Sequence, residues 1–361
     1  MKIAIYAISL NEEKFIERFY NSAKDADVII LADTGSTDST VKVAKKLGIK
    51  TYSIAVNPWR FDTARNAALA LIPLDVDVCI SVDVDEVMLP GWREVVESTW
   101  DSNITRMQYR FDNGGGNIFN ATKIHKRTGY TWHNLCHEMI EIDPRLQETW
   151  AVSNDILIEH HPDPTKSRGQ YLPMLLAAVK EQPHSHRNAW YLAREYWYHK
   201  QHAEAVAEWT RYLGMPGATW HHERSFALRH KAKSLLALNK IDDALQAHRQ
   251  AIESSPGLRE NWLELAQACY ELNRWRECYY AATTALDIND REWIFTCDPS
   301  VWGWRPYDLA AISAWHLGLI DSAITYGQQA LSQSPQDQRL KANLDYYYSS
   351  KVQEKTENAS T

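Results

Sequence analysis

The feature that most constrains this chain is a repeat of small residues in its second half. Four small residues are each followed, twelve positions later, by another: Ala193 and Ala205, Ala232 and Ala244, Ala266 and Cys278, Ala311 and Ala323. Small residues at such offsets let two antiparallel helices approach closely. Pro256 and Pro335 lie twelve residues after Ala244 and Ala323, where proline would stop the second helix of a pair. The second half therefore predicts stacked helix pairs.

The spacing between these units identifies the type of repeat. Ala266 follows Ala232 by 34 residues, which is the tetratricopeptide period, and the other spacings are 39 and 45, the longer one containing an insertion around Trp293–Trp304. Four units exceed the roughly three that bury a continuous core. We expect an all-α tetratricopeptide superhelix over residues 183–350 and a disordered polar tail at 351–361. The concave face of such an array is expected to be a binding surface.

The first half, residues 1–182, alternates apolar runs with helical patterns. Strands are predicted at 2–9, 27–32, 50–56, 76–82, 106–111 and 123–127, and helices at 12–23, 40–47 and 61–72. Such alternation predicts an α/β domain with a parallel, Rossmann-like sheet. Polar clusters at 11–13, 33–38 and 83–86 each follow a strand. They are therefore expected to meet at the carboxyl edge, where such sheets bind ligands.

Composition and missing motifs exclude several classes. The net charge of −7 argues against a dedicated nucleic-acid binder. Five scattered cysteines without a CxxC pair are typical of reduced thiols in a cytoplasmic protein. No apolar run approaches the ~20 residues of a membrane span, and we expect no signal peptide. The absence of GxGxxG after the first strand and of GxxxxGK[ST] disfavours dinucleotide dehydrogenases and P-loop enzymes.

Two carboxylates flank Val84 at the end of the fourth predicted strand. In an extended chain, Asp83 and Asp85 would point to the same side and present oxygens to one hard cation, Mg²⁺ or Mn²⁺. Such a cation would act as a Lewis acid on a leaving diphosphate.

Four stretches, in order, extend this pattern: ISLNEEKFIERF, ADTGSTDSTVKVAKKLG, WRFDTARNAAL and CISVDVDE. Residues 1–140 resemble the family-2 inverting glycosyltransferases of the GT-A fold. The resemblance implies that Asn11 and Glu12 line the nucleotide pocket and that Asp33 contacts the nucleoside. It also implies that Arg65 holds the base or the phosphate side.

The same resemblance gives roles to the acidic cluster and to later residues. It implies that Asp83 touches the ribose or the metal and that Asp85 binds the metal directly. This fold often recruits a late histidine as a third metal ligand, and His160 and His161 end the apolar run 156–158. Lys166 and Arg168 are candidates for holding diphosphate or, equally, solvated charges at a helix start.

The segment 132–138 (WHNLCHE) resembles the one that closes the sugar site in a sub-branch of these transferases. An inverting transfer needs one base to deprotonate the acceptor. Glu138 is the first candidate, and Asp112 and Glu86 are the alternatives. His137 is a candidate phosphate or metal contact.

The leading hypothesis is a metal-dependent glycosyltransferase that takes a sugar from a UDP-sugar donor with Mn²⁺ or Mg²⁺. Peptide, protein, glycan, lipid-linked glycan and modified nucleic acid remain open as acceptors. The concave face of the repeats is expected to bind the acceptor or to form a homodimer with a second copy of the chain. A nucleotidyltransferase-like enzyme is disfavoured because no basic glycine-rich phosphate loop is present. The alternative of another class is a tetratricopeptide scaffold whose first domain has lost catalysis.

Overall fold

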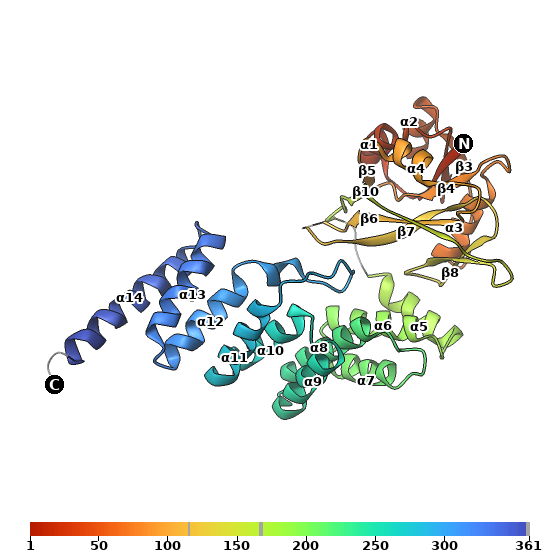
Figure 1. The fold of residues 1–361 in the computed structure, drawn as a ribbon. Helices are drawn as coiled ribbons and strands as arrows, with labels where there is room; N and C mark the ends of the chain where they lie inside the picture. The colour runs from red at the N-terminus through yellow and green to blue at the C-terminus, as the bar shows by residue number, and fades with distance from the viewer. Residues whose placement is uncertain (115, 166–168, 359–361) are drawn as a thin grey trace. The chain divides into compact units, whose positions relative to one another are not determined.

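The computed structural model describes residues 1–114, 116–165 and 169–358, and its contacts divide the chain into two compact units. Unit 1 holds Met1–Pro183 together with Trp293–Phe295, and unit 2 holds His184–Glu292 and the chain from Thr296 onward. Figure 1 shows unit 1 as a layered α/β fold and unit 2 as a row of helices.

Unit 1 contains an eight-stranded sheet and a two-stranded sheet. The strands of the large sheet are β1 (Ile3–Ser9), β2 (Val28–Asp33), β3 (Lys50–Ser53), β4 (Val78–Ser81), β5 (Glu86–Met88), β6 (Arg106–Asp112), β7 (Ile118–Lys126) and β10 (Trp150–His160). Their order is β3-β2-β1-β4-β7-β6-β10-β5. The small sheet pairs β8 (Tyr130–His133) with β9 (Met139–Ile142).

The large sheet is parallel only in part, which corrects the prediction of a parallel sheet. β3, β2, β1 and β4 are parallel neighbours, whereas β7 runs antiparallel to both β4 and β6, and β5 runs antiparallel to β10. Because β6 and β10 are parallel to each other, the carboxyl ends of β1, β2, β4, β6 and β10 all lie at one edge. The mixed second half thus adds two strand ends to the edge predicted to bind ligand.

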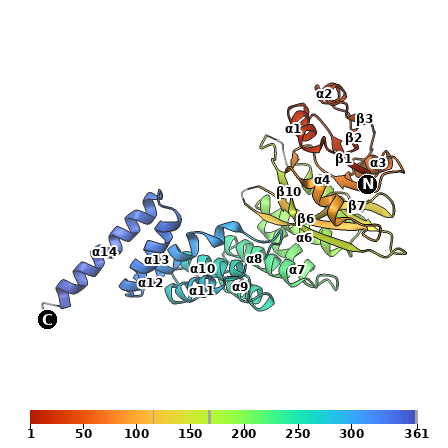
Figure 2. The same cartoon turned by 45° about the horizontal axis from the view of Figure 1, so that its top comes forward.

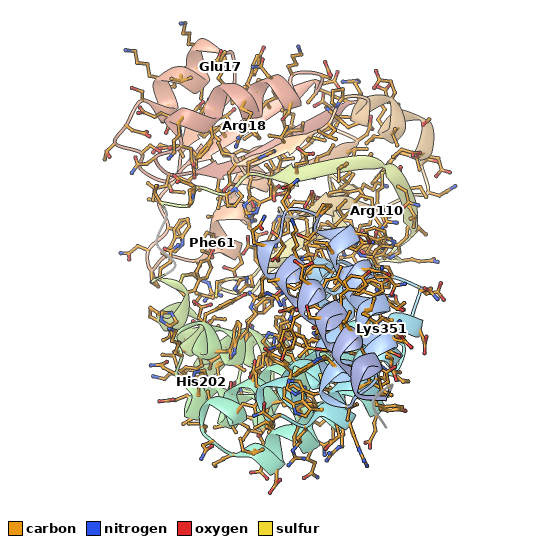
Figure 3. All side chains as sticks on the ribbon, turned by 90° about the vertical axis from the view of Figure 1, so that its left-hand side faces the viewer. Glu17, Arg18, Phe61, Arg110, His202 and Lys351 are labelled. Carbon is orange, nitrogen blue, oxygen red and sulfur yellow. The ribbon has the colours of Figure 1, made fainter. Side chains whose placement is uncertain are left out.

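Both faces of the large sheet are covered by other elements. Side chains alternate along β1, so that successive residues contribute to the packing on opposite faces. Ile3, Ile5 and Ala7 pack with α1 (Glu13–Ala23), α2 (Thr40–Lys46) and α4 (Trp92–Thr99). Ala4 and Tyr6 pack with α3 (Phe61–Ala70) and with the β8–β9 pair on the other face. Figure 3 marks Phe61, the first residue of α3. Helix α3 and the β8–β9 pair thus cover the same face of the large sheet.

Unit 2 follows a final helix of unit 1, α5 (Tyr171–Glu181), and consists of helix pairs. The pairs are α6 (His186–Tyr198) with α7 (His202–Leu213), α8 (His221–Ala237) with α9 (Ile241–Ser254), α10 (Arg259–Glu271) with α11 (Trp275–Asp287), and α12 (Arg305–His316) with α13 (Ile320–Gln333). Helix α14 (Gln338–Asn358) follows. Figures 1 and 2 show the pairs in succession, as the predicted superhelix requires.

The small residues that predicted the pairs lie inside them. All eight are at most 1% exposed: Ala193, Ala205, Ala232, Ala244, Ala266, Cys278, Ala311 and Ala323. The first helices of successive pairs also contact one another, α6 with α8, α8 with α10 and α10 with α12. Two tryptophans of the first pair, Trp190 and Trp209, are buried and pack edge to face against each other.

The later part of the insertion after α11 packs against the helix array. It contains the 3-10 helix η1 (Pro299–Trp302), and Val301 is fully buried in the core of unit 2. The Arg259 guanidinium lies 4.0 Å from the Trp302 ring centre, and the Asp298 backbone N donates to Glu260 Oε1 at 3.0 Å. The longest predicted repeat spacing is therefore an insertion with its own contacts.

Other predicted features concern the cysteines, the tail and membrane spans. All five cysteines are buried free thiols. Helix α14 continues to Asn358, across most of the segment predicted as a disordered tail. No helix in the described ranges is long and apolar enough to cross a membrane.

Candidate active site

Polar side chains gather at one edge of the large sheet, beyond the carboxyl ends of its parallel strands. β1 ends at Ser9, two residues before Asn11, β2 ends at Asp33, and β4 ends at Ser81, two residues before Asp83. Because β1 pairs in parallel with both β2 and β4, the three ends are adjacent. The structure brings these residues to one edge, as the strand order predicted.

Arg65, on α3, links two parts of this edge. Its side chain is 7% exposed, Nη2 donates to Asp83 Oδ1 at 2.7 Å, and Nε donates to Glu138 Oε1. Nη1 donates to Ser81 Oγ at 3.2 Å, and the guanidinium lies 5.0 Å from the Trp132 ring centre. Burial would lower the pKa of Arg65, but the two carboxylates outweigh it and raise that pKa. One permanent cation thus joins the acidic strand end to the β8–β9 loop.

Lys123, on β7, is a second cation beside the acidic strand end. The pairing of β4 with β7 brings Lys123 there, with Nζ 2.9 Å from Glu86 Oε1 and 3.4 Å from Asp83 Oδ2. Burial would raise the pKa of Asp83, but Arg65 and Lys123 hold it well below its usual range. Burial does raise the pKa of Glu86, although Lys123 opposes the shift. Both oxygens of Asp83 are therefore held by cations.

The chain between Asp83 and Glu86 is a turn, not an extended segment. The Glu86 backbone N donates to Asp83 O at 2.9 Å, and residues 84 and 85 form the turn. The prediction assumed an extended chain between Asp83 and Asp85, and the structure corrects that assumption. The turn carries the chain from β4 to β5, which pairs with β10, so that Asp85 Oδ2 lies 3.4 Å from His160 Nε2. The hydrogen bond to Asp85 raises the pKa of His160.

Asp85 and His160 are the side chains that fit a divalent cation. They offer a carboxylate and an imidazole, which are suitable ligands for Mn²⁺. Among the described residues no group of three or more His, Cys, Asp or Glu side chains could hold a metal ion. A cation here would take its other ligands from water and substrate phosphates, as Mg²⁺ commonly does. The other predicted histidine ligand, His161, has its Nε2 3.1 Å from Glu159 Oε2.

Asp33 organises the loop that follows β2. Its Oδ2 accepts hydrogen bonds from the backbone N of Gly35 at 3.1 Å and of Ser36 at 2.9 Å, and its Oδ1 accepts from Ser9 Oγ at 3.0 Å. Gly35 has φ +111°, a conformation that favours glycine. Asp33 is 4% exposed, so its visible role is to fix this loop, and the predicted contact with a nucleoside stays a prediction.

Asn11 and Glu12 join the same loop to the end of β1. Asn11 has φ 56°, and its Oδ1 accepts a hydrogen bond from the Thr37 backbone N at 2.8 Å. The Glu12 backbone N donates to Thr40 Oγ1 at 2.7 Å, at the start of α2. These bonds shape the surface that the resemblance assigns to the nucleotide.

A buried hydrogen-bond network that the sequence did not predict holds Trp132, whose ring packs against Arg65. Trp132 Nε1 donates to Tyr6 Oη at 2.9 Å, and Tyr6 Oη lies 2.9 Å from His125 Nε2. Asn66 binds the backbone of Trp132 on both sides, at 2.8 Å each. Burial lowers the pKa of His125 to about 3. The Trp132 ring against which Arg65 packs is thus fixed by strands β1, β7 and helix α3.

The remaining predicted residues lie around this edge or outside the described ranges. Asp112 ends β6, and its Oδ1 accepts from the Gly114 backbone N at 2.8 Å. The His137 ring stacks on Tyr171 with centroids 5.3 Å apart. Lys166 and Arg168 lie outside the described residues. The sequence analysis missed Lys123. This residue lies on β7 and belongs to none of the motif stretches.

Comparisons with known proteins agree with this arrangement. Residues 5–142 match the family model described as "Glycosyl transferase family 2". An uncharacterized glycosyltransferase of Rickettsia bellii (strain RML369-C) is 34% identical over 97 residues, which are 27% of this chain and 32% of that protein. One of Rickettsia typhi (strain ATCC VR-144 / Wilmington) is 32% identical over 103 residues, 28% of this chain and 34% of that protein. The chain thus spans about a third of the length of these relatives.

Solved helical repeat structures resemble the second half. The MamA protein covers 45% of this chain and 81% of its own, at 15% identity and a TM-score of 0.38. YrrB, described as a TPR protein with an unusual peptide-binding site, covers 49% of this chain and 84% of its own, at 12% identity and a TM-score of 0.40.

Together, the mixed sheet with its acidic edge and the array of helix pairs define an α/β domain of the GT-A type followed by tetratricopeptide-like repeats. Within the α/β unit, residues 5–142 match a glycosyl transferase family 2 domain.

Proposed function

We propose that the protein is a metal-dependent inverting glycosyltransferase that uses a UDP-sugar. The observation that carries the proposal is that Arg65 binds Asp83 and Glu138 at once. One side chain therefore holds a carboxylate of the donor edge and a carboxylate of the acceptor-side loop within reach of each other. The domain of residues 1–182 would carry the reaction, and residues 183–350 would form the repeat domain.

On the donor side, the loop fixed by Asp33 and Asn11 would receive the nucleoside, and Asp83 would contact the ribose or the metal. Asp85 and His160 would hold Mn²⁺ or Mg²⁺, which supplies Lewis-acid stabilisation to the leaving diphosphate when bound. His160 must give up its proton before it can bind a metal, so this binding is expected to weaken at low pH. His161 remains an alternative metal ligand, and Lys166 and Arg168 remain proposed contacts of the diphosphate.

On the acceptor side, Glu138 is the proposed general base. Arg65 holds its Oε1, and its Oε2 receives no hydrogen bond from the described residues. A carboxylate anchored through one oxygen is oriented while the other oxygen stays able to take the acceptor proton. A single displacement at the anomeric carbon needs only this one base, and it inverts the configuration. Asp112 and Glu86 remain the alternative bases.

The repeats would hold part of the acceptor, which could be a peptide, a protein, a glycan or a lipid-linked glycan, or they would form a homodimer. Tetratricopeptide arrays present a concave surface to partners. Five buried free thiols support a cytoplasmic location.

The competing proposal is a repeat scaffold whose first domain no longer catalyses. The convergence of Asp83, Glu86 and Glu138 with the buried Arg65 and the half-buried Lys123 favours an enzyme, because burying charges is costly and a scaffold gains nothing from it.

The test combines melting with product release. A ligand that binds the native state raises the melting temperature, so UDP with Mn²⁺ should stabilise the full chain and CMP should stabilise it less. UDP release would then be measured across UDP-sugars, since donor hydrolysis does not need the acceptor. No shift with any nucleotide and no UDP release with any donor would favour the scaffold.

A further inference from the structure

Lys123 is a half-buried cation at the acidic edge that neither the motifs nor the proposed reaction uses. Its Nζ lies 2.9 Å from Glu86 Oε1 and 3.4 Å from Asp83 Oδ2, and its side chain is 25% exposed. We propose that Lys123 is an internal counter-ion that competes with a divalent cation for Asp83 and thereby sets the metal affinity of the site. This inference rests on the metal dependence in the proposed function.

The contacts of Asp83 give the first argument. Arg65 Nη2 holds Oδ1 at 2.7 Å, whereas Lys123 holds Oδ2 at the longer distance of 3.4 Å. A metal that recruits Asp83 next to Asp85 needs a lone pair on one of these oxygens. Oδ2 is the oxygen with the weaker partner, so it is the one that Lys123 would release.

The contacts of Lys123 itself give the second argument. Its shorter contact is with Glu86, whose side chain is 3% exposed and pairs with Lys123 from the far side of the turn. The ammonium therefore keeps a buried carboxylate partner when it leaves Asp83. Phe111 fixes its position further, because Nζ lies 5.6 Å from the Phe111 ring centre, and that ring stacks on His160 at 6.3 Å between centroids.

The charge balance gives the direction of the effect. The edge contains four carboxylates, Asp83, Asp85, Glu86 and Glu138, which outnumber the two cations. Replacing Lys123 by a neutral residue removes one positive charge that repels the metal, so the net charge of the site becomes more negative by one unit. Over a few ångströms in a partly buried site, such a change should tighten Mn²⁺ binding by about tenfold or more.

A purely structural lysine predicts a different result. If Lys123 only neutralises buried Glu86, its removal destabilises the fold and leaves metal affinity unchanged. Lys123→Met alone leaves Glu86 without its cation and can fail to fold for that reason. The pair Glu86→Gln and Glu86→Gln/Lys123→Met avoids this, because Glu86 carries no charge in either variant and the two differ only at Lys123.

The experiment is a Mn²⁺ titration of the full chain without nucleotide, read by the electron paramagnetic resonance signal of free Mn²⁺. Lys123→Met should bind Mn²⁺ about tenfold more tightly than wild type, and Lys123→Arg should stay within about threefold of it. The double variant should likewise bind more tightly than Glu86→Gln. Melting curves without metal establish that each variant is folded.

The possible outcomes separate the two proposals. Equal or weaker Mn²⁺ binding when Lys123 is replaced, in a folded protein and in both backgrounds, overturns the role of Lys123. Wild-type binding in Asp85→Asn, with tighter binding still seen on replacing Lys123, overturns the proposed metal site and leaves Lys123 supported. Binding by neither wild type nor the Lys123 variants overturns both.

Discussion

Arg65→Lys tests whether one side chain coordinates the donor edge and the acceptor-side loop. In the structure, three different nitrogens of Arg65 bind Asp83, Ser81 and Glu138. A lysine keeps the charge but replaces this planar fork with one compact ammonium. It can approach Asp83 or Glu138, but it cannot reproduce the separate bonds in their present positions.

The magnitude follows from the bond that is lost. A hydrogen bond to a charged group contributes about 1.5–3 kcal/mol. If the substitution gives up one of the two carboxylate bonds in the transition state, kcat/KM should fall by about 10- to 150-fold at ~1.4 kcal/mol per tenfold. Unfolding should become easier by a similar ~2 kcal/mol, whereas Arg65→Met, which leaves two carboxylates without this cation, should cost ~3–5 kcal/mol.

The assay is UDP release over a range of donor concentrations, together with urea unfolding of each variant. Arg60→Lys is the matched control, because Arg60 immediately precedes α3 and pairs with Asp62 and Glu181 away from the acidic edge. It should keep kcat/KM within about twofold. A folded Arg65→Lys protein with kcat/KM within about threefold of wild type would refute the argument that Arg65 joins the two sides.

Four further changes probe separate parts of the chain. Glu138→Gln should lower kcat by about 10²–10⁴-fold with little change in UDP affinity, and matched loss of UDP binding would assign it a structural role instead. Asp85→Ala should abolish Mn²⁺-dependent UDP binding in calorimetry while the melting temperature stays nearly constant. His248 is buried, and burial lowers its pKa to about 4. The unfolded chain therefore binds a proton at His248 at a higher pH than the folded chain does. The fold keeps its full stability above pH 6.5 and loses stability as the pH falls toward 4. The loss is ~2 kcal/mol at pH 5, and His248→Phe should flatten it in urea unfolding at pH 7 and 5. Gly129→Ala should cost ~1–2 kcal/mol in the same assay, because Gly129 has φ +85° and a Cβ would lie 2.6 Å from Leu146 Cδ1.

The strands of unit 1 were predictable where apolar runs end at polar clusters. The first run was predicted at 2–9 and forms β1 at Ile3–Ser9, and the second was predicted at 27–32 and forms β2 at Val28–Asp33. β5 at Glu86–Met88 was not predicted, because three residues carry no periodicity and the strand exists through its pairing with β10. Its antiparallel direction is one reason why the sheet is mixed.

The candidate site was predictable to the same extent. Residues that directly follow parallel strands, such as Asp33 and Asp83, reach the expected edge because strand direction alone puts them there. The geometry between Asp83 and Asp85 was not predictable from their spacing, since it depends on the turn that leads to β5. Lys123 could not be found locally, because only the pairing of β7 with β4 brings it to Asp83.

The repeats were easier to predict than the site because their contacts are local in sequence. Ala232 and Ala244 pack within one helix pair, twelve residues apart, and the next pair repeats the same contact at Ala266 and Cys278. Arg65 and Glu138, in contrast, are 73 residues apart, and the bond between them exists only when α3 and the β8–β9 loop have both docked on the sheet. In the repeats, the same contact recurs in each helix pair, so the sequence shows its pattern several times. Each contact of the site occurs only once and leaves no such pattern. The site therefore has to be read from the folded chain: the motif that contains Arg65 is visible in the sequence, but its bonds to Asp83 and Glu138 are not.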